Sequence, residues 1–190
     1  MTNIAVFVSG SGTNCENIIR YFRANPTISV SLVVSNRSDA FALQRAQRLH
    51  VPTAVVSGAD FCDEDKMLPL LKDYRIDFIV LAGFLQKIPP FLIRAYEKRM
   101  INIHPALLPK YGGKGMYGHH VHEAVKVAGE KETGMTVHWV TEEYDKGEII
   151  AQVSTPVLHE DTPEDIAEKE HVLEMEHFPR IIEEVIGRLH

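Results

Sequence analysis

Apolar runs and helical repeats alternate along the first hundred residues of the chain. The run at residues 4–8 is apolar at every position, which is typical of a strand covered on both faces of a sheet. Strands are predicted at residues 4–8, 31–35, 53–56, 76–82 and 100–103. Between them, apolar side chains recur at helical spacing, as at Cys15, Ile18, Ile19 and Phe22 and again over residues 40–49. This repeated order predicts a parallel sheet with right-handed crossovers.

The second half of the chain has a different pattern. Residues 133–141 alternate, with Thr136 and His138 on one side of a strand and apolar residues on the other, which predicts a half-buried strand. Only a short polar connection separates this strand from the one at residues 148–157, so the two are expected to be antiparallel. The predicted fold class is therefore α/β: a single-domain, Rossmann-like open sheet over residues 1–190, mostly parallel, with antiparallel strands at one side and helices on both faces.

Capping residues and prolines predict where the later helices begin. Asp65 is placed to cap a helix with an apolar face, which puts Pro69 in the first turn, where N–H groups have no internal partner. Thr162 precedes a proline and two acids, a typical helix start. Pro179 interrupts the pattern of this last helix before apolar residues resume.

A glycine turn follows the first strand. Strand 4–8 leads into Ser9-Gly10-Ser11-Gly12-Thr13-Asn14 and then a helix, with Thr13 or Asn14 placed to cap the helix start. This order aims backbone N–H groups and the positive end of the helix dipole at an anion. A dinucleotide is disfavoured because Cys15 stands where the GxGxxG fingerprint requires glycine. A single phosphate fits better, although the glycines alone also suit a tight turn.

The stretch Asn102-Ile103-His104-Pro105 carries the main candidate chemistry. Asn102 and His104 are two residues apart on a predicted strand, so both side chains project from the same side. Pro105 ends the strand and leaves the imidazole at its carboxyl end, which is where ligands bind in open parallel sheets. On these residues alone, a hydrogen-bonded core histidine remains the alternative.

Composition narrows the class of protein. With 190 residues the chain is expected to form one domain that buries roughly 70% of its unfolded surface. A formal net charge of −6 argues against nucleic acid as a partner. Cys15 and Cys62 show neither disulfide nor metal-site spacing. No apolar run is long enough for a membrane span, and no basic flank marks a signal peptide, so a soluble, cytoplasmic protein is expected.

Three histidines, His119, His120 and His122, suggest a metal site at first sight. Val121, Ala124, Val125 and Ala128 predict the buried face of a helix there, with the histidines on its exposed turn. Two histidines three residues apart without a carboxylate partner are weak evidence for zinc. No metal site is predicted.

The run Asn-x-His-Pro-x-Leu-Leu-Pro, followed about forty residues later by Asp145, resembles the active-site signature of the folate-dependent formyltransferases. The resemblance covers nearly the whole chain. Its matching stretches are residues 8–14, 81–84 and 102–111, Thr136-Val137-His138, Asp145 and Glu174. Within the family, the length suits the small purine-biosynthesis branch, because relatives that act on initiator tRNA carry an added domain and the formyl-folate hydrolases usually add a regulatory one.

This resemblance implies two small-molecule substrates, 10-formyltetrahydrofolate as formyl donor and glycinamide ribonucleotide as acceptor, and no metal. It assigns the ribonucleotide to Gly12, Thr13, Asn14, His171 and Glu174. It assigns the folate to Leu85, Gln86, Lys87, Ile88, Asn102, Thr141, Glu142, Glu143, Tyr144 and Asp145, with Thr136 and His138 in support. Residues 1–100 would form the nucleotide- and phosphate-binding half, and residues 101–190 the catalytic and folate-binding half with C-terminal helices. The chain departs from the family at Gln86 and Lys87, where many members have a basic and then an aliphatic residue, and at His171, where others have glutamine.

Formyl transfer explains why Asn102, His104 and Asp145 would be needed. Attack by an amine on the formyl carbon builds negative charge on the formyl oxygen, which the Asn102 amide and a protonated His104 can stabilise. A nearby Asp145 carboxylate is expected to raise the pKa of His104. His104 then passes a proton to the departing folate nitrogen. Direct transfer without a covalent intermediate is expected.

Three alternatives remain open at this stage. The chain can be a hydrolase that releases formate, or a formyltransferase for an amino sugar nucleotide. From a different class, it can be a nonenzymatic nucleotide-binding sensor that keeps the phosphate loop. Membrane and nucleic-acid partners are not expected, and a monomer and a homodimer are equally compatible with the sequence.

Overall fold

A computed structural model describes residues 1–189 of the chain. The strands are β1 (Thr2–Val8), β2 (Ile28–Ser35), β3 (Thr53–Val55), β4 (Phe78–Leu81), β5 (Met100–His104), β6 (Glu132–Trp139) and β7 (Ile149–Pro156). The helices are α1 (Thr13–Phe22), α2 (Phe41–Arg48), α3 (Gly58–Phe61), α4 (Glu64–Asp73), α5 (Pro90–Ala95), α6 (His119–Val127) and α7 (Pro163–Gly187).

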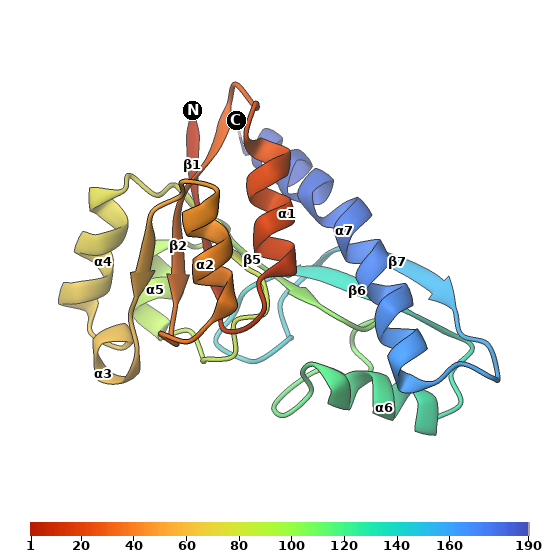
Figure 1. The fold of residues 1–190 in the computed structure, drawn as a ribbon. Helices are drawn as coiled ribbons and strands as arrows, with labels where there is room; N and C mark the ends of the chain where they lie inside the picture. Colours follow the sequence, from red (N-terminus) through yellow and green to blue (C-terminus); the bar gives the residue numbers. More distant parts are fainter. Residues whose placement is uncertain (190) are drawn as a thin grey trace.

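The strands form one seven-stranded sheet in the order β3-β2-β1-β4-β5-β6-β7 (Figure 1). Neighbouring strands from β3 to β5 are parallel, whereas β6 pairs antiparallel with both β5 and β7. The predicted fold class is thereby confirmed. Because the chain moves from β1 outward to β3 and then returns to β4 on the other side of β1, the strand order reverses beside β1. This reversal is the place where open α/β sheets bind ligands.

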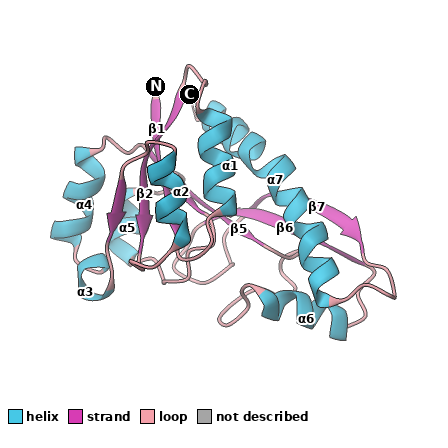
Figure 2. Ribbon diagram, viewed as in Figure 1, coloured by secondary structure: helices cyan, strands magenta, loops and turns pink. Residues whose placement is uncertain are grey.

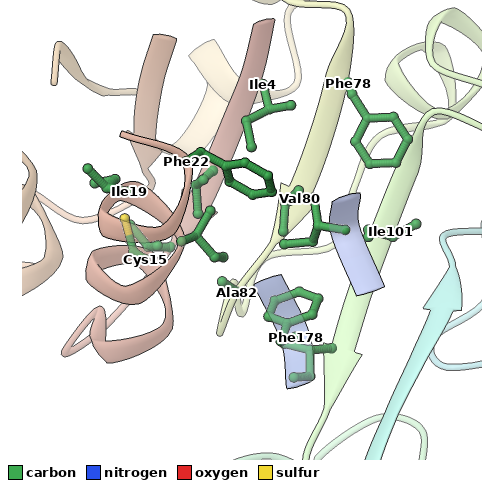
Figure 3. Close-up of a cluster of buried hydrophobic side chains, with 14 of the residues drawn as sticks. Ile4, Cys15, Ile19, Phe22, Phe78, Val80, Ala82, Ile101 and Phe178 are labelled. Carbon is green, nitrogen blue, oxygen red and sulfur yellow. The ribbon is translucent and has the colours of Figure 1, made fainter. Parts of the chain in front are cut away.

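Helices cover both faces of the sheet, as predicted (Figure 2). Even-numbered residues of β1, such as Ile4 and Val6, join the core under α1, α2 and α7, which also holds Phe178 (Figure 3). Odd-numbered residues, such as Phe7, join the core under α3, α4 and α5. The apolar run of β1 is thus buried on both faces, and a fully buried phenylalanine such as Phe178 contributes about 1.5–3 kcal/mol.

The prediction of a half-buried strand at residues 133–141 is wrong. Thr136 is 0% and His138 3% exposed, so both faces of β6 are covered. The turn that follows β5 folds over the polar face: the Thr136 hydroxyl donates to the Ala106 carbonyl (2.6 Å) and accepts from the Leu108 N–H (3.0 Å). Polar residues on this face are buried because backbone groups satisfy them.

Helix α4 begins two residues earlier than predicted. The Asp63 side chain accepts from the N–H of Asp65, so Asp63 and not Asp65 is the cap. Pro69 therefore lies inside the helix and not in its first turn, so the expected placement is wrong. Helices α3 and α5 were not predicted, because elements of four and six residues are too short to show a periodic pattern.

Pro179 does not divide the last helix, which is continuous over 25 residues. A proline inside a helix leaves the carbonyl four residues earlier without its usual N–H donor. Here that carbonyl belongs to Met175, and the side-chain amide of Asn17 on α1 donates to it (2.8 Å). The tertiary contact thus compensates the break that the local sequence predicts. Within residues 1–189, no helix has the combination of length and apolar character that a membrane crossing requires.

Candidate active site

A pocket of about 1030 Å³ opens at the carboxyl ends of the central strands, beside the point where the strand order reverses. Segments far apart in the sequence form its walls. They are residues 10–14 after β1, 81–88 at and after the end of β4, 102–105 at the end of β5, 113–119 and 122 before and in α6, 138 and 140–145 at and after the end of β6, and 164, 167, 168, 170, 171 and 174 in α7. The predicted phosphate, folate and catalytic segments therefore share one cavity.

Strand pairing sets Asn102 beside His138. The two residues are partners in the antiparallel pair of β5 with β6, as are His104 and Thr136. The His138 Nδ1–H donates to the Trp139 carbonyl (2.9 Å), so in the neutral ring Nε2 is an acceptor. That nitrogen lies 3.1 Å from Asn102 Nδ2, which must be the donor. The second N–H of the Asn102 amide remains available to a ligand oxygen in the pocket.

Asp145 approaches His104 from the loop between β6 and β7. Its Oδ2 atom lies 3.5 Å from His104 Nδ1, and its Oδ1 atom lies 3.4 Å from His138 Nε2. The backbone N–H of Gly113 donates to Oδ2 (2.8 Å) and holds the carboxylate in this position. The His104 and Asp145 side chains are only 5% and 11% exposed. The amide, imidazole and carboxylate thus converge, although they come from two different parts of the chain.

The pKa of His104 differs from the expectation. Burial lowers this pKa below its ordinary value. The Asp145 carboxylate and the Tyr111 carbonyl both raise it, but together they do not offset the effect of burial. Asp145 acts in the predicted direction, but the net shift of the His104 pKa is downward, because desolvation outweighs the charge of Asp145. Burial on its own would raise the pKa of Asp145, but the contact with His138, the charge of His104 and the Gly113 N–H together keep it below its ordinary value.

The glycine-rich segment at residues 110–118 contacts the imidazole directly. His104 Nε2 lies 2.7 Å from the Tyr111 carbonyl oxygen, so its N–H donates there. A ligand oxygen can accept from Nε2 only after the Tyr111 carbonyl has moved. The segment packs tightly at Gly112, where a Cβ would lie 2.5 Å from Leu108 Cδ2 and 3.3 Å from Asp145 Cβ.

Helix α1 presents an uncapped first turn to the pocket. Gly12 occupies the N-cap position with φ 76°, and no side chain caps the helix, so the prediction of Thr13 or Asn14 as the cap is wrong. The N–H groups of this turn remain open to an anion. Glycine is required at position 12 for two reasons: its φ is positive, and there is no room for a side chain, because a Cβ there would lie 2.3 Å from Ala42 Cβ.

Asn14 is instead directed across the pocket to α7. Its Nδ2 atom donates to Glu174 Oε2 (2.7 Å), a contact between residues 160 positions apart. His171 Nδ1 lies 3.4 Å from the same oxygen, and this contact raises the pKa of His171 above its ordinary value. Glu174 is only 9% exposed, so this face of α7 is not an ordinary solvated edge. The residues predicted to hold the ribonucleotide are adjacent in space.

The predicted folate segments line the same pocket. Residues 141–144 are exposed, whereas Asp145 beside them is largely buried. Ile88 is buried in the core (5% exposed), while Leu85 is half exposed. Gln86 and Lys87 also line the cavity, where their polar ends are open to a ligand.

The pocket also contains two residues that sequence reasoning missed. His122 is 6% exposed and faces the cavity, so the prediction that all three histidines lie on an exposed turn is wrong for His122 and correct for His119 and His120. Glu170 is 3% exposed and lines the same wall as Glu174. Glu170 lies four residues before Glu174, so helical spacing places both on one face of α7, and this spacing could have identified Glu170 from the sequence. No set of three or more metal-ligating side chains is grouped within residues 1–189.

The sheet topology, the pocket at the reversal point and the converging amide, imidazole and carboxylate define an α/β protein equipped for group transfer at a carbonyl carbon. Comparison with known families agrees with this class. The family model described as "Formyl transferase" matches residues 2–182. The chain therefore belongs to the formyl transferase family.

Individual relatives carry more specific names. The chain is 40% identical to a chloroplastic phosphoribosylglycinamide formyltransferase of Arabidopsis thaliana, covering 98% of this chain and 64% of that protein. It is 35% identical to the phosphoribosylglycinamide formyltransferase of Haemophilus influenzae, covering 96% and 86%. The crystal structure of glycinamide ribonucleotide transformylase 1 from Symbiobacterium toebii superposes with a TM-score of 0.88 at 33% identity, covering 99% of this chain and 89% of that one. The chain thus spans less than two thirds of the Arabidopsis relative.

Proposed function

We propose that this protein transfers the formyl group of 10-formyltetrahydrofolate to the amino group of glycinamide ribonucleotide, a step of purine biosynthesis. One observation supports this most directly: Asn102, His104 and Asp145 converge in a pocket of about 1030 Å³ that is also lined by the residues predicted to hold the ribonucleotide and the folate. Relatives named for this activity, at 35–40% identity, favour it over the other formyl transfer reactions.

The two substrates approach the catalytic group from opposite walls. The acceptor phosphate lies at the open first turn of α1, and the ribose lies toward Glu174 and His171. The folate occupies the space between residues 85–88 and residues 141–145. In this arrangement each substrate contacts residues from both ranges of the chain, 1–100 and 101–190.

The reaction follows from the hydrogen-bonding groups in the pocket. The acceptor amine attacks the formyl carbon, and the free Asn102 N–H donates to the oxygen that gains negative charge. His104, neutral because of burial, takes on Nε2 the proton that the amine loses, and Asp145 stabilises the resulting cation. This step requires that the Tyr111 carbonyl has moved away from Nε2 and that the ring proton is on Nδ1, beside Asp145. The bond between the formyl carbon and the folate nitrogen then breaks, and His104 returns the proton to that nitrogen.

A direct assay separates this reaction from its rivals. Purified protein is incubated with 10-formyltetrahydrofolate, with and without glycinamide ribonucleotide, and both formate and formylated product are measured. The proposed function predicts formylated ribonucleotide with acceptor and no formate without it. Formate released in the absence of acceptor would identify a hydrolase, formylation of an amino sugar nucleotide alone would identify that transferase, and tight nucleotide binding without transfer would identify a sensor.

His171 is expected to make acceptor binding dependent on pH. Glu174 raises the pKa of His171, so the imidazolium that attracts the phosphate persists above the ordinary pKa and is lost as pH rises further. The KM for glycinamide ribonucleotide should then rise by up to about fivefold across that range, a modest effect because the side chain is 35% exposed. His171→Gln should reduce this slope. Equal slopes in both proteins, measured by steady-state kinetics, would remove His171 from phosphate binding.

A further inference from the structure

One buried acid in the pocket wall takes no part in the proposed reaction. Glu170 is 3% exposed and lies one turn before Glu174, which is 9% exposed, on the inner face of α7. No lysine or arginine within residues 1–189 forms an ion pair with either carboxyl group. His171 contacts Glu174, but no ion pair to Glu170 is formed within the described residues, so it is costly for both buried carboxyl groups to be ionised.

The contacts of the pair indicate which group carries the proton. Glu174 accepts from the Asn14 amide and contacts His171, whereas Glu170 makes neither contact. A hydrogen bond between the two carboxyl groups would require a proton on one of them. Burial and the neighbouring Glu174 both raise the pKa of Glu170 well above its ordinary value. Glu170 is therefore the neutral partner and the donor.

We propose that Glu170 is a positioning residue: its protonated carboxyl group donates to Glu174 and directs the Glu174 carboxylate toward Asn14 and the bound acceptor. This inference rests on the proposed function, since it assigns the acceptor to this wall. It explains why an additional acid is tolerated beside a phosphate site, because a neutral Glu170 adds no repulsion. It also predicts that acceptor binding weakens when Glu170 ionises.

Other atoms of this wall also lack partners. Glu170 Oε1, Asn14 Oδ1 and His122 Nδ1 are buried and have no hydrogen-bond partner within the described residues. All three residues line the same pocket. Buried polar atoms are normally satisfied, so three such atoms in one wall indicate a ligand with several hydroxyl groups. A ribose meets this requirement.

Several other titratable groups line the same pocket as Glu170. Besides Glu174 and His171, α7 places Glu164 and Glu168 on the pocket wall, and α6 places His119 and His122 there. Helix α1 contributes the neutral Asn14 amide, β6 contributes His138, and β7 contributes no pocket residue within the described chain. His171 is the group in this set whose own titration most resembles the effect expected of Glu170. The test is therefore made with His171 replaced.

The first experiment measures KM and kcat for glycinamide ribonucleotide from about pH 6 to about pH 9 in His171→Gln protein. The Glu170→Gln side chain still donates a hydrogen bond but cannot ionise. Adding it should keep KM near neutral pH within about twofold of the His171→Gln value and should flatten the rise of KM at high pH. Adding Glu170→Val should raise KM about tenfold at all pH values with kcat nearly unchanged. Glu176→Gln, an exposed acid on the same helix, is the matched control and should change neither. Identical pH profiles with and without the Glu170→Gln substitution would overturn the proposal.

The second experiment does not depend on activity. Protein carrying ¹³C-labelled glutamate carboxyl groups is titrated by NMR, and the resonance absent in Glu170→Gln is assigned to Glu170. It should remain protonated at neutral pH and titrate above it, whereas titration near the ordinary value of about 4.3 would overturn the proposal. If the parent protein transfers no formyl group but this resonance still titrates above neutral pH, the proposed function is wrong, whereas the protonated state of Glu170 beside Glu174 is still supported.

Discussion

Replacing His104 with alanine is expected to lower kcat about a thousandfold, with little change in KM for either substrate. The imidazole both accepts the proton of the attacking amine and returns one to the folate nitrogen, and positioned acid–base groups contribute roughly 10²–10⁴-fold to rates. Its neutral resting form, which burial enforces, is the form that accepts the proton. Single-turnover formyl transfer at saturating substrates measures the loss.

The matched control for this variant is His120→Ala. His120 lies on α6 with 65% of its side chain exposed and is not part of the pocket wall, so its removal should leave kcat within about twofold. Because His104 also donates to the Tyr111 carbonyl, the alanine variant is expected to lose about 1–3 kcal/mol of stability, which thermal unfolding checks separately. A folded His104→Ala protein with normal turnover would refute the catalytic assignment.

Replacing Asp145 with asparagine is expected to lower kcat about a hundredfold and to move the acidic limb of the kcat/KM profile to lower pH. The amide oxygen can still accept from Gly113, so the loop keeps its anchor while the negative charge is lost. Asp145 raises the pKa of His104 against the effect of burial, and without it that pKa falls further. His104 then becomes deprotonated, and able to act as a base, at a lower pH.

Glu148→Gln provides the comparison for Asp145→Asn, since it removes an exposed carboxylate from the same connection between β6 and β7. It should shift neither kcat nor the profile. An acidic limb that stays in place in Asp145→Asn would show that Asp145 does not act on His104, whatever happens to kcat. A rise in KM for the folate without that shift would instead favour a role in folate binding.

The sheet was predictable because the signals for it are local. Continuous apolar runs identified β1, β4 and β5 as strands covered on both faces, and a short polar connection identified β6 and β7 as an antiparallel pair. The period-2 geometry of a strand likewise placed Asn102 and His104 on one side. None of these inferences needed a contact between distant residues.

The errors arose where a distant contact replaces a local one. Asn14 resembles a helix cap, but its amide donates to Glu174 on the last helix. Pro179 resembles a helix break, but Asn17 satisfies the carbonyl that the proline leaves without a donor. His122 resembles an exposed turn residue, but the packing of α6 against α7 buries it. In each case the sequence pattern indicated the local preference correctly, and tertiary structure overrode it.

By itself, the sequence determined the order of the strands and of the longer helices, the glycine turn after β1 and the placement of the amide and imidazole at one strand end. These features depend on periodicity and on the backbone preferences of neighbouring residues. Only the tertiary structure decided that Asp145 lies 3.5 Å from His104, that Glu170 is buried beside Glu174, and that the pKa of His104 is lowered. Charge interactions depend on distance and burial, and folding sets both through contacts between residues far apart in the chain.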